Sequence, residues 1–101
     1  MFKDIRGDPI PRQYREYELS ISYDQLKAEG QYLGRMDAQG WQYLYYLWRG
    51  GIAQAQFEHG YLYIIWYWED PGEVMFIPDS KLNRTGLKLK RMVEDGTYGK
   101  L

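Results

Sequence analysis

The chain contains two stretches that are apolar on both faces of a β-strand. They are Trp41–Arg49 and Tyr61–Trp68, which read WQYLYYLWR and YLYIIWYW. Side chains alternate between the two faces of a sheet, so each face of these strands carries large apolar groups. A strand of this kind is normally covered on both sides. The pattern therefore predicts a sheet with a helix on one face and a second layer, a partner subunit or a ligand on the other.

Turn signals separate these strands and predict an antiparallel meander. Gly50-Gly51 is a two-residue hairpin signal, and His59-Gly60 marks the next turn. Between the two turns we expect a strand with one apolar face, Ala53, Ala55 and Phe57, and one outward face, Gln54, Gln56 and Glu58. Glu69–Gly72 predicts a further turn, and a short strand is expected over Glu73–Ile77, where Pro78 stops it.

The segment before the aromatic strands predicts a strand followed by a helix. Tyr17, Leu19, Ile21 and Tyr23 alternate with polar residues, which is typical of a strand with one wet face. Ser22 or Asp24 then supplies an N-cap, and Leu26, Leu33 and Met36 share a helical face that Gly40 ends. Gly30 and Gly34 fall inside this predicted helix, four residues apart. They indicate a close approach, either tight helix–sheet packing or contact with a partner or ligand.

The predicted architecture is an α+β domain, an antiparallel sheet of four or five strands with one main helix packed on one face. We expect an irregular N-terminal arm over residues 1–13, a single domain over residues 14–95 and a C-terminal tail over residues 96–101. Asp79–Gly86 predicts a loop. The alternation at Leu87–Lys90 fits an edge strand, but Leu87–Asp95 equally fits a short helix, and the pattern is too brief to decide.

Composition excludes several classes of function. The chain has no Cys and one His, which excludes a disulfide framework, a thiolate zinc site and a multi-histidine metal site. The formal net charge of −1 argues against general binding of duplex nucleic acid. The apolar runs are shorter than the roughly 20 residues that span a bilayer, and the N-terminus lacks an apolar signal core. We therefore expect a cytoplasmic protein, with 11 Tyr and 4 Trp supplying much of its core.

Catalytic signals are weak, so we expect a protein that is not an enzyme and needs no cofactor or metal. His59 and Glu58 form the only His–carboxylate pair, but they are adjacent in an expected turn, where little desolvation tunes an imidazole. Glu69, Asp70 and Glu73 match no metal-binding loop and fit a solvated turn. The serines have no nucleophile-elbow context, and the chain has no phosphate-binding loop.

A basic segment next to aromatic strands is the most informative signal for function. Between Asp79 and Arg91 the chain carries several cations and one acidic residue. Arg and Lys bind phosphate, and aromatic faces stack on bases, so this pairing suits an anionic, ring-bearing ligand. The stacking candidates are Trp48, Trp66 and Trp68, and the phosphate-binding candidates are Arg49, Arg84, Lys88 and Arg91. The alternative is a solvated basic face that protects a sheet edge, with the rings used for packing.

One set of residues resembles a known family. Tyr14 and Tyr17 in a strand, then a helix, then Leu33-Gly34 and Gln39-Gly40-Trp41 resemble a family of small uncharacterised bacterial and phage domains with the pattern EYK…LN-x-LG-x-EGWELV. Gln39 stands where that pattern has Glu, and residues 71–101 lie outside the resemblance. The resemblance implies a strand–helix–meander fold and no known activity. Small oligomeric phage proteins that sequester nucleotide signals are similar in size, which adds weight to the ligand hypothesis.

These observations together predict a non-catalytic, homo-oligomeric binding protein, phage-encoded by that likeness. It is expected to hold a nucleotide-like anion at or near a subunit interface, since apolar surface left uncovered on a sheet usually marks an interface. The alternative is a protein–protein interaction module or inhibitor that acts on a host or partner protein.

Overall fold

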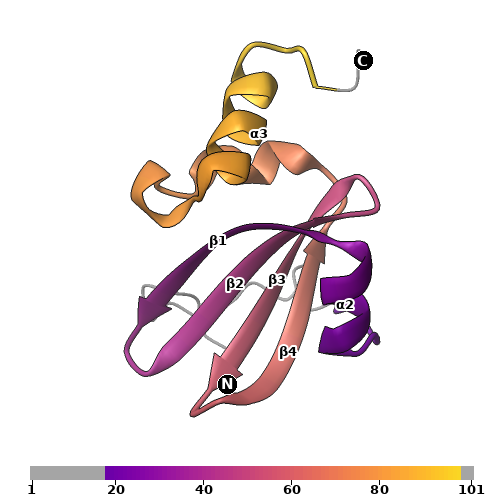
Figure 1. Cartoon of the computed structure of the whole chain (residues 1–101), viewed down its shortest axis with the longest axis vertical. Coiled ribbons are helices and arrows are strands. Elements are labelled where there is room, and N and C mark those ends of the chain that lie inside the picture. The colour runs from indigo at the N-terminus through magenta and orange to yellow at the C-terminus, as the bar shows by residue number, and fades with distance from the viewer. Residues whose placement is uncertain (1–17, 99–101) are drawn as a thin grey trace.

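The computed structural model describes residues 18–98 and confirms the α+β architecture (Figure 1). A four-stranded antiparallel sheet has the order β1-β2-β3-β4. Its strands are β1 (Gln31–Ala38), β2 (Trp41–Trp48), β3 (Gly51–Glu58) and β4 (Tyr61–Trp68). The helical elements are α2 (Tyr23–Glu29), the 3-10 helices η1 (Pro71–Phe76) and η2 (Asp79–Lys81), and α3 (Arg84–Glu94).

Three tight hairpins connect the strands. Each turn has two residues with positive φ, at Gln39-Gly40, Arg49-Gly50 and His59-Gly60. Two residues in this conformation form the type I′ turn, whose twist matches that of the flanking strands. The prediction at His59-Gly60 is confirmed. The turn between β2 and β3 lies one residue earlier than Gly50-Gly51, because Gly51 already pairs with Trp48.

The predicted helix from Ser22 or Asp24 to Gly40 is wrong beyond its first two turns. Ser22 is the N-cap, and its Oγ accepts a hydrogen bond from the Gln25 amide at 3.0 Å. The helix ends at Glu29, where the amide of Gly30 donates to the carbonyl of Leu26. The chain then enters β1, so Gly30 ends a helix and Gly34 lies in a strand.

A β-bulge explains why β1 has a helical spacing of apolar residues. Strand pairing shifts between Tyr32 and Gly34, which leaves Leu33 as the extra residue. Leu33 and Met36 would point to opposite faces of a regular strand, but after the shift both are buried in one core cluster. Gly34 forms a bridge with Leu82, so the close approach that its glycine indicated is to the backbone after η2.

Both faces of the sheet are covered within the chain, as the two-faced strands require. On one face Tyr43, Tyr45 and Ile52 pack in a core with residues of η1 and α3. On the other face Tyr46, Ala53, Ala55 and Ile65 pack with Leu26 of α2, together with Leu19, Ile21 and Tyr23. Figure 1 shows α3 and α2 on different sides of the strands.

Covering both faces also changes the predicted exposure of β3. The expected outward residue Gln56 is only 3% exposed. Its side-chain carbonyl accepts a hydrogen bond from Nε1 of Trp66 at 3.0 Å. A buried amide needs such a partner, so Gln56 is a polar residue of the core.

The predicted strand over Glu73–Ile77 is wrong, because this segment forms most of η1. Asp70 is the N-cap, and its Oδ1 accepts from the amide of Gly72 at 2.8 Å, while Pro71 favours the first helical turn. Of the two structures predicted for the segment from Leu87, an edge strand or a short helix, the helix is observed, and it begins earlier, at Arg84. Asn83 caps α3 by accepting from the amide of Gly86 at 2.8 Å.

Segments outside the sheet contact both of its edges. The amide of Leu19 donates to the carbonyl of Ile65 in β4 at 2.9 Å, and the amide of Asn83 donates to the carbonyl of Leu33 in β1 at 2.8 Å. Within the described residues, the predicted strand around Tyr17–Tyr23 is reduced to one bridge, Glu18 to Trp66.

Parts of three predicted segments lie outside residues 18–98. They are the arm at 1–13, the start of the first predicted strand, and residues 99–101 of the tail. The rest of the tail is described and packs back on the domain, where the hydroxyl of Tyr98 donates to the carbonyl of Gly50 at 3.3 Å.

Candidate functional site

Trp48 and Arg49 form a closed group with Glu29 of α2. The indole Nε1 of Trp48 donates to Oε1 of Glu29 at 3.1 Å, and Nη2 of Arg49 lies 3.4 Å from the same oxygen. The Arg49 guanidinium also lies over the Trp48 ring, 4.3 Å from its centroid. Trp48 is buried. The Arg49 guanidinium therefore makes a cation–π contact with the Trp48 ring and an ion pair with the Glu29 carboxylate, to which the Trp48 indole also donates.

Trp66 and Trp68, the other two predicted stacking residues, lie on the opposite face of the sheet. Trp66 is 1% exposed and belongs to the core. Trp68 is half-buried at the end of β4, where it lines a small cavity under η1. The structure therefore does not bring the three predicted stacking residues together at one site.

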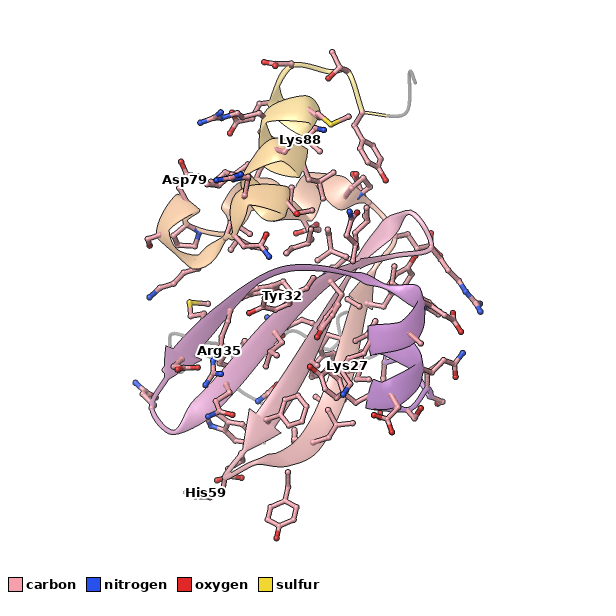
Figure 2. All side chains as sticks on the ribbon, in the orientation of Figure 1. Lys27, Tyr32, Arg35, His59, Asp79 and Lys88 are labelled. Atoms are coloured by element: carbon pink, nitrogen blue, oxygen red, sulfur yellow. The ribbon has the colours of Figure 1, made fainter. Side chains whose placement is uncertain are left out.

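The remaining predicted phosphate-binding residues share one exposed side of α3. Arg84, Lys88 and Arg91 are four and three residues apart, a spacing that places them on one side of a helix. Leu89 and Gly86 face inward, where Leu89 enters the core and Gly86 contacts Leu33. Lys88 lies on α3 at the end of the molecule opposite His59 (Figure 2).

The neighbouring Lys90 forms an ion pair, whereas these three cations have no carboxylate partner among the described residues. Nζ of Lys90 lies 2.8 Å from Oδ1 of Asp79 and donates to the carbonyl of Ile77 at 2.6 Å. Within residues 18–98, Arg84, Lys88 and Arg91 have no carboxylate within 4.0 Å of their nitrogens. Three unpaired like charges on one surface favour an anion there.

Two adjoining hollows lie beside these cations. One is an open groove of about 420 Å³ lined by Arg84, Leu87, Lys88, Arg91, Met92 and Asp95. The other, of about 220 Å³, lies between α3 and the sheet and is lined by Gln31, Leu33, Leu47, Thr85, Lys88, Leu89, Met92 and Tyr98. Lys88 and Met92 line both hollows, so the cationic groove is continuous with a mainly apolar one. We call this combined surface the α3 groove.

The sequence missed Tyr98, the aromatic residue of the α3 groove, because its segment was expected to be a frayed tail. Gly96 has φ 72°, the conformation that ends a helix, and the amides of Thr97 and Tyr98 both donate to the carbonyl of Met92. This turn directs the chain back toward the domain. The glycine after the last apolar residues of the helix was the available signal.

The catalytic candidates remain exposed and weakly coupled. His59 lies in the turn between β3 and β4, its side chain is 81% exposed, and its Nε2 is 3.9 Å from Oε1 of Glu58 (Figure 2). Asp70 of the acidic turn is used as the cap of η1. In the described part of the chain, no group of three His, Cys, Asp or Glu residues is placed to hold a metal ion.

Comparison with known proteins identifies no relative. The chain matches no family model, and neither the curated proteins nor the solved structures contain a match. Among residues 18–98, no helix has the length and apolar character needed to cross a membrane. The case for function therefore depends on the geometry of the chain itself.

Proposed function

We propose that the protein is a non-catalytic binding protein for a nucleotide-like anion, which it holds in the α3 groove. The observation that carries this proposal is the set of three cations, Arg84, Lys88 and Arg91, which share one exposed side of α3 and have no carboxylate partner within residues 18–98. Guanidinium groups bind phosphate oxygens through paired hydrogen bonds, and Lys adds a point charge. A polyanion would relieve the mutual repulsion of the three side chains.

The apolar hollow next to these cations supports a ligand that also carries a flat ring. Tyr98 offers an aromatic face, Met92 an adaptable thioether, and Thr85 a hydroxyl at the same hollow. Ligand sites typically combine apolar walls with a few polar groups that fix orientation. Phosphates on the cations and a base against Tyr98 would use both parts of the α3 groove.

Homo-oligomerisation remains part of the proposal, but the covered sheet no longer requires it. Apolar surface persists at the start of β4, where Tyr61 is 79%, Leu62 40% and Tyr63 48% exposed. A second copy on this surface would remove it from water. Native mass spectrometry tests this part, since a defined oligomer supports it and a monomer at micromolar concentration contradicts it.

Exposed aromatic surface also favours the second candidate, a protein–protein interaction module. Phe76 is 82% exposed at the end of η1, and Met75 beside it is 43% exposed. Large apolar side chains of this kind are common anchors in interfaces. A module of this type would be indifferent to nucleotides and would lose its partner when Phe76 is replaced by Ala.

Titration calorimetry with ATP tests the main proposal. The Arg84→Gln/Arg91→Gln variant is expected to bind ATP at least about tenfold more weakly, because two phosphate contacts are lost. Arg35→Gln is the matched control, since Arg35 is also exposed but pairs with Asp37 on β1, at 2.9 Å between Nε and Oδ1.

Two partial ligands separate the roles of phosphate and ring. Adenosine lacks the phosphates and inorganic triphosphate lacks the ring, so both are expected to bind more weakly than ATP. The proposal is overturned if the wild-type protein does not bind ATP, or if the double variant and Arg35→Gln bind it equally well.

A further inference from the structure

A second cavity lies between η1 and the sheet and shares no residue with the α3 groove. Its volume is about 110 Å³, and it is lined by Met36, Tyr45, Ile52, Gln54, Trp68, Glu73, Phe76, Ile77 and Pro78. This space is enough for a group of a few heavy atoms. The cavity therefore suits a compact group rather than a long chain.

Three aromatic residues from three elements contribute to its lining. Tyr45 comes from β2, Trp68 from the end of β4 and Phe76 from the end of η1. Tyr45 is buried and held by a hydrogen bond from Nε2 of Gln54 to its hydroxyl at 3.4 Å. Phe76 contributes to the lining although it is 82% exposed.

The charged residue of the cavity lining is Glu73. Glu73 contributes a carboxylate to a lining that is otherwise mostly apolar, and Glu69 and Asp70 precede it by a few residues. The ammonium of Lys90 contacts the carbonyl of Ile77 in the lining, but it is paired with Asp79 at 2.8 Å. Within residues 18–98, no cation lies within 4.0 Å of the Glu73 carboxylate.

We propose that this cavity binds an alkylated ammonium group, with the positive charge balanced by Glu73 and the methyl groups against Tyr45, Trp68 and Phe76. Aromatic faces attract cations electrostatically, and cages of such rings recognise quaternary ammonium groups. A trimethylammonium group has four heavy atoms, in keeping with the volume. A neutral apolar group would fill the same space but would leave the carboxylate desolvated without a partner.

A bare metal ion suits the cavity poorly. Hard divalent cations take several oxygen ligands, and a single carboxylate with one amide does not supply them. The described residues also place no three acidic or imidazole groups together. The combination of rings with one carboxylate therefore distinguishes an organic cation from a metal.

Choline and its neutral isostere, 3,3-dimethylbutan-1-ol, test the proposal on the full-length chain by NMR titration of the tryptophan indole signals. Choline is expected to bind saturably and at least about tenfold more tightly than the alcohol. Glu73→Gln keeps the shape of the side chain and should weaken choline binding about tenfold. Glu69→Gln removes the same charge from outside the cavity and should change it less than about twofold.

Two further measurements identify the source of the cation and test whether this cavity and the α3 groove bind independently. A trimethyl-lysine peptide that binds more tightly than choline indicates a protein-borne group, and the reverse indicates a free small molecule. Arg84→Gln/Arg91→Gln is expected to leave choline binding unchanged, because the α3 groove is separate. The proposal is overturned if choline does not bind, if the neutral alcohol binds equally well, or if Glu73→Gln binds choline like the wild type.

Discussion

At the scale of single residues, the aromatic side chains are held by polar partners as well as by packing. Nε1 of Trp66 bonds to Gln56, Nε1 of Trp48 bonds to Glu29, and the hydroxyls of Tyr23 and Tyr46 lie 2.8 Å apart. In the part of the chain that the structure describes, every buried side-chain nitrogen and oxygen has a partner. This allows a core rich in Tyr and Trp, because each polar tip keeps the hydrogen bond that water would have given.

Tyr46 is expected to make the stability of the fold sensitive to alkaline pH. Burial raises the pKa of the Tyr46 hydroxyl, and its hydrogen bond with Tyr23 raises it further. The unfolded chain loses this proton near pH 10, whereas the folded chain keeps it to higher pH. The stabilisation is therefore complete below about pH 10 and is lost as the pH rises through the folded pKa, by up to about 1.4 kcal/mol per pH unit.

Urea unfolding between pH 8 and 11 measures this dependence. Tyr46→Phe removes the hydrogen bond and should lower the free energy of unfolding by about 1 kcal/mol at pH 8. Above pH 10 the stability of this variant should fall less steeply than that of the wild type. Tyr61→Phe, at a side chain that is 79% exposed, is the control and should follow the wild type. Equal slopes for Tyr46→Phe and wild type would contradict the role given to Tyr46.

The candidate site was only partly predictable from single residues. The sequence indicated Arg84, Lys88 and Arg91 because they follow one another in a basic run, and the helix then places them on one side. It could not show that Trp48 and Arg49 pair with Glu29, since these residues meet only through the packing of α2 on β2. Tyr98 was missed because its segment was expected to be a tail, and Glu73 was considered only as part of a solvated acidic turn.

At the scale of elements, β2, β3 and β4 were predicted, whereas β1 was expected to be part of a helix. Trp41–Trp48 and Tyr61–Trp68 carry a continuous apolar pattern that admits one interpretation. Leu33 and Met36, three residues apart, fit a helix in the sequence, but the bulge at Leu33 gives a strand the same spacing. Local pattern alone cannot separate the two, because the bulge depends on tertiary contacts with the segment after η2.

Gly34→Ala is expected to destabilise the fold severely. Gly34 has φ 154°, and a Cβ there would overlap the carbonyl oxygen of Lys81 and lie 2.8 Å from Cα of Leu82. Backbone atoms cannot yield as a flexible side chain does, so we expect a loss of about 3 kcal/mol or more in free energy of unfolding. Urea denaturation measures it.

Gly40→Ala provides the matched control for this test. Gly40 also has positive φ, at 83°, but a Cβ there meets nothing within 4 Å. Gly40→Ala should therefore lower the free energy of unfolding only by the conformational cost of a non-glycine residue at positive φ, about 1–2 kcal/mol. Equal losses in the two variants would mean that the segment of η2 moves aside and that its contact with β1 is not rigid.

At the scale of the whole molecule, the sheet separates two cores. Leu89 of α3 belongs to the core on one face and Leu26 of α2 to the core on the other. Both cores contain residues of β2, β3 and β4, and only the core on the side of α3 also contains residues of β1, so the sheet is the element that both depend on. The two proposed binding sites both lie on the face covered by η1 and α3.

The losses in free energy of unfolding caused by Leu26→Ala and by Leu89→Ala are therefore expected to be additive. Each should cost about 2–5 kcal/mol, and the double variant should equal their sum to within about 0.5 kcal/mol, because they share no neighbours across the sheet. Leu33→Ala with Leu89→Ala is the control pair, since both lie in one core and should be coupled. Urea unfolding in a fixed concentration of stabilising osmolyte keeps the double variants folded. Strong coupling between Leu26 and Leu89 would contradict two independent cores.

The hydrogen bonds at the two edges of the sheet have a consequence for aggregation. A strand such as YLYIIWYW, rich in rings and free of charge, is of the kind that stacks into cross-β fibrils when its edge is open. The amide of Leu19 is bonded to a carbonyl of β4 and the amide of Asn83 to a carbonyl of β1. These two carbonyls therefore already have a donor and are less available to a strand from another molecule. The short segments before α2 and before α3 thus cover part of the two sheet edges, and we expect that losing the segment before α2 would leave β4 more open to pairing with a strand of another chain.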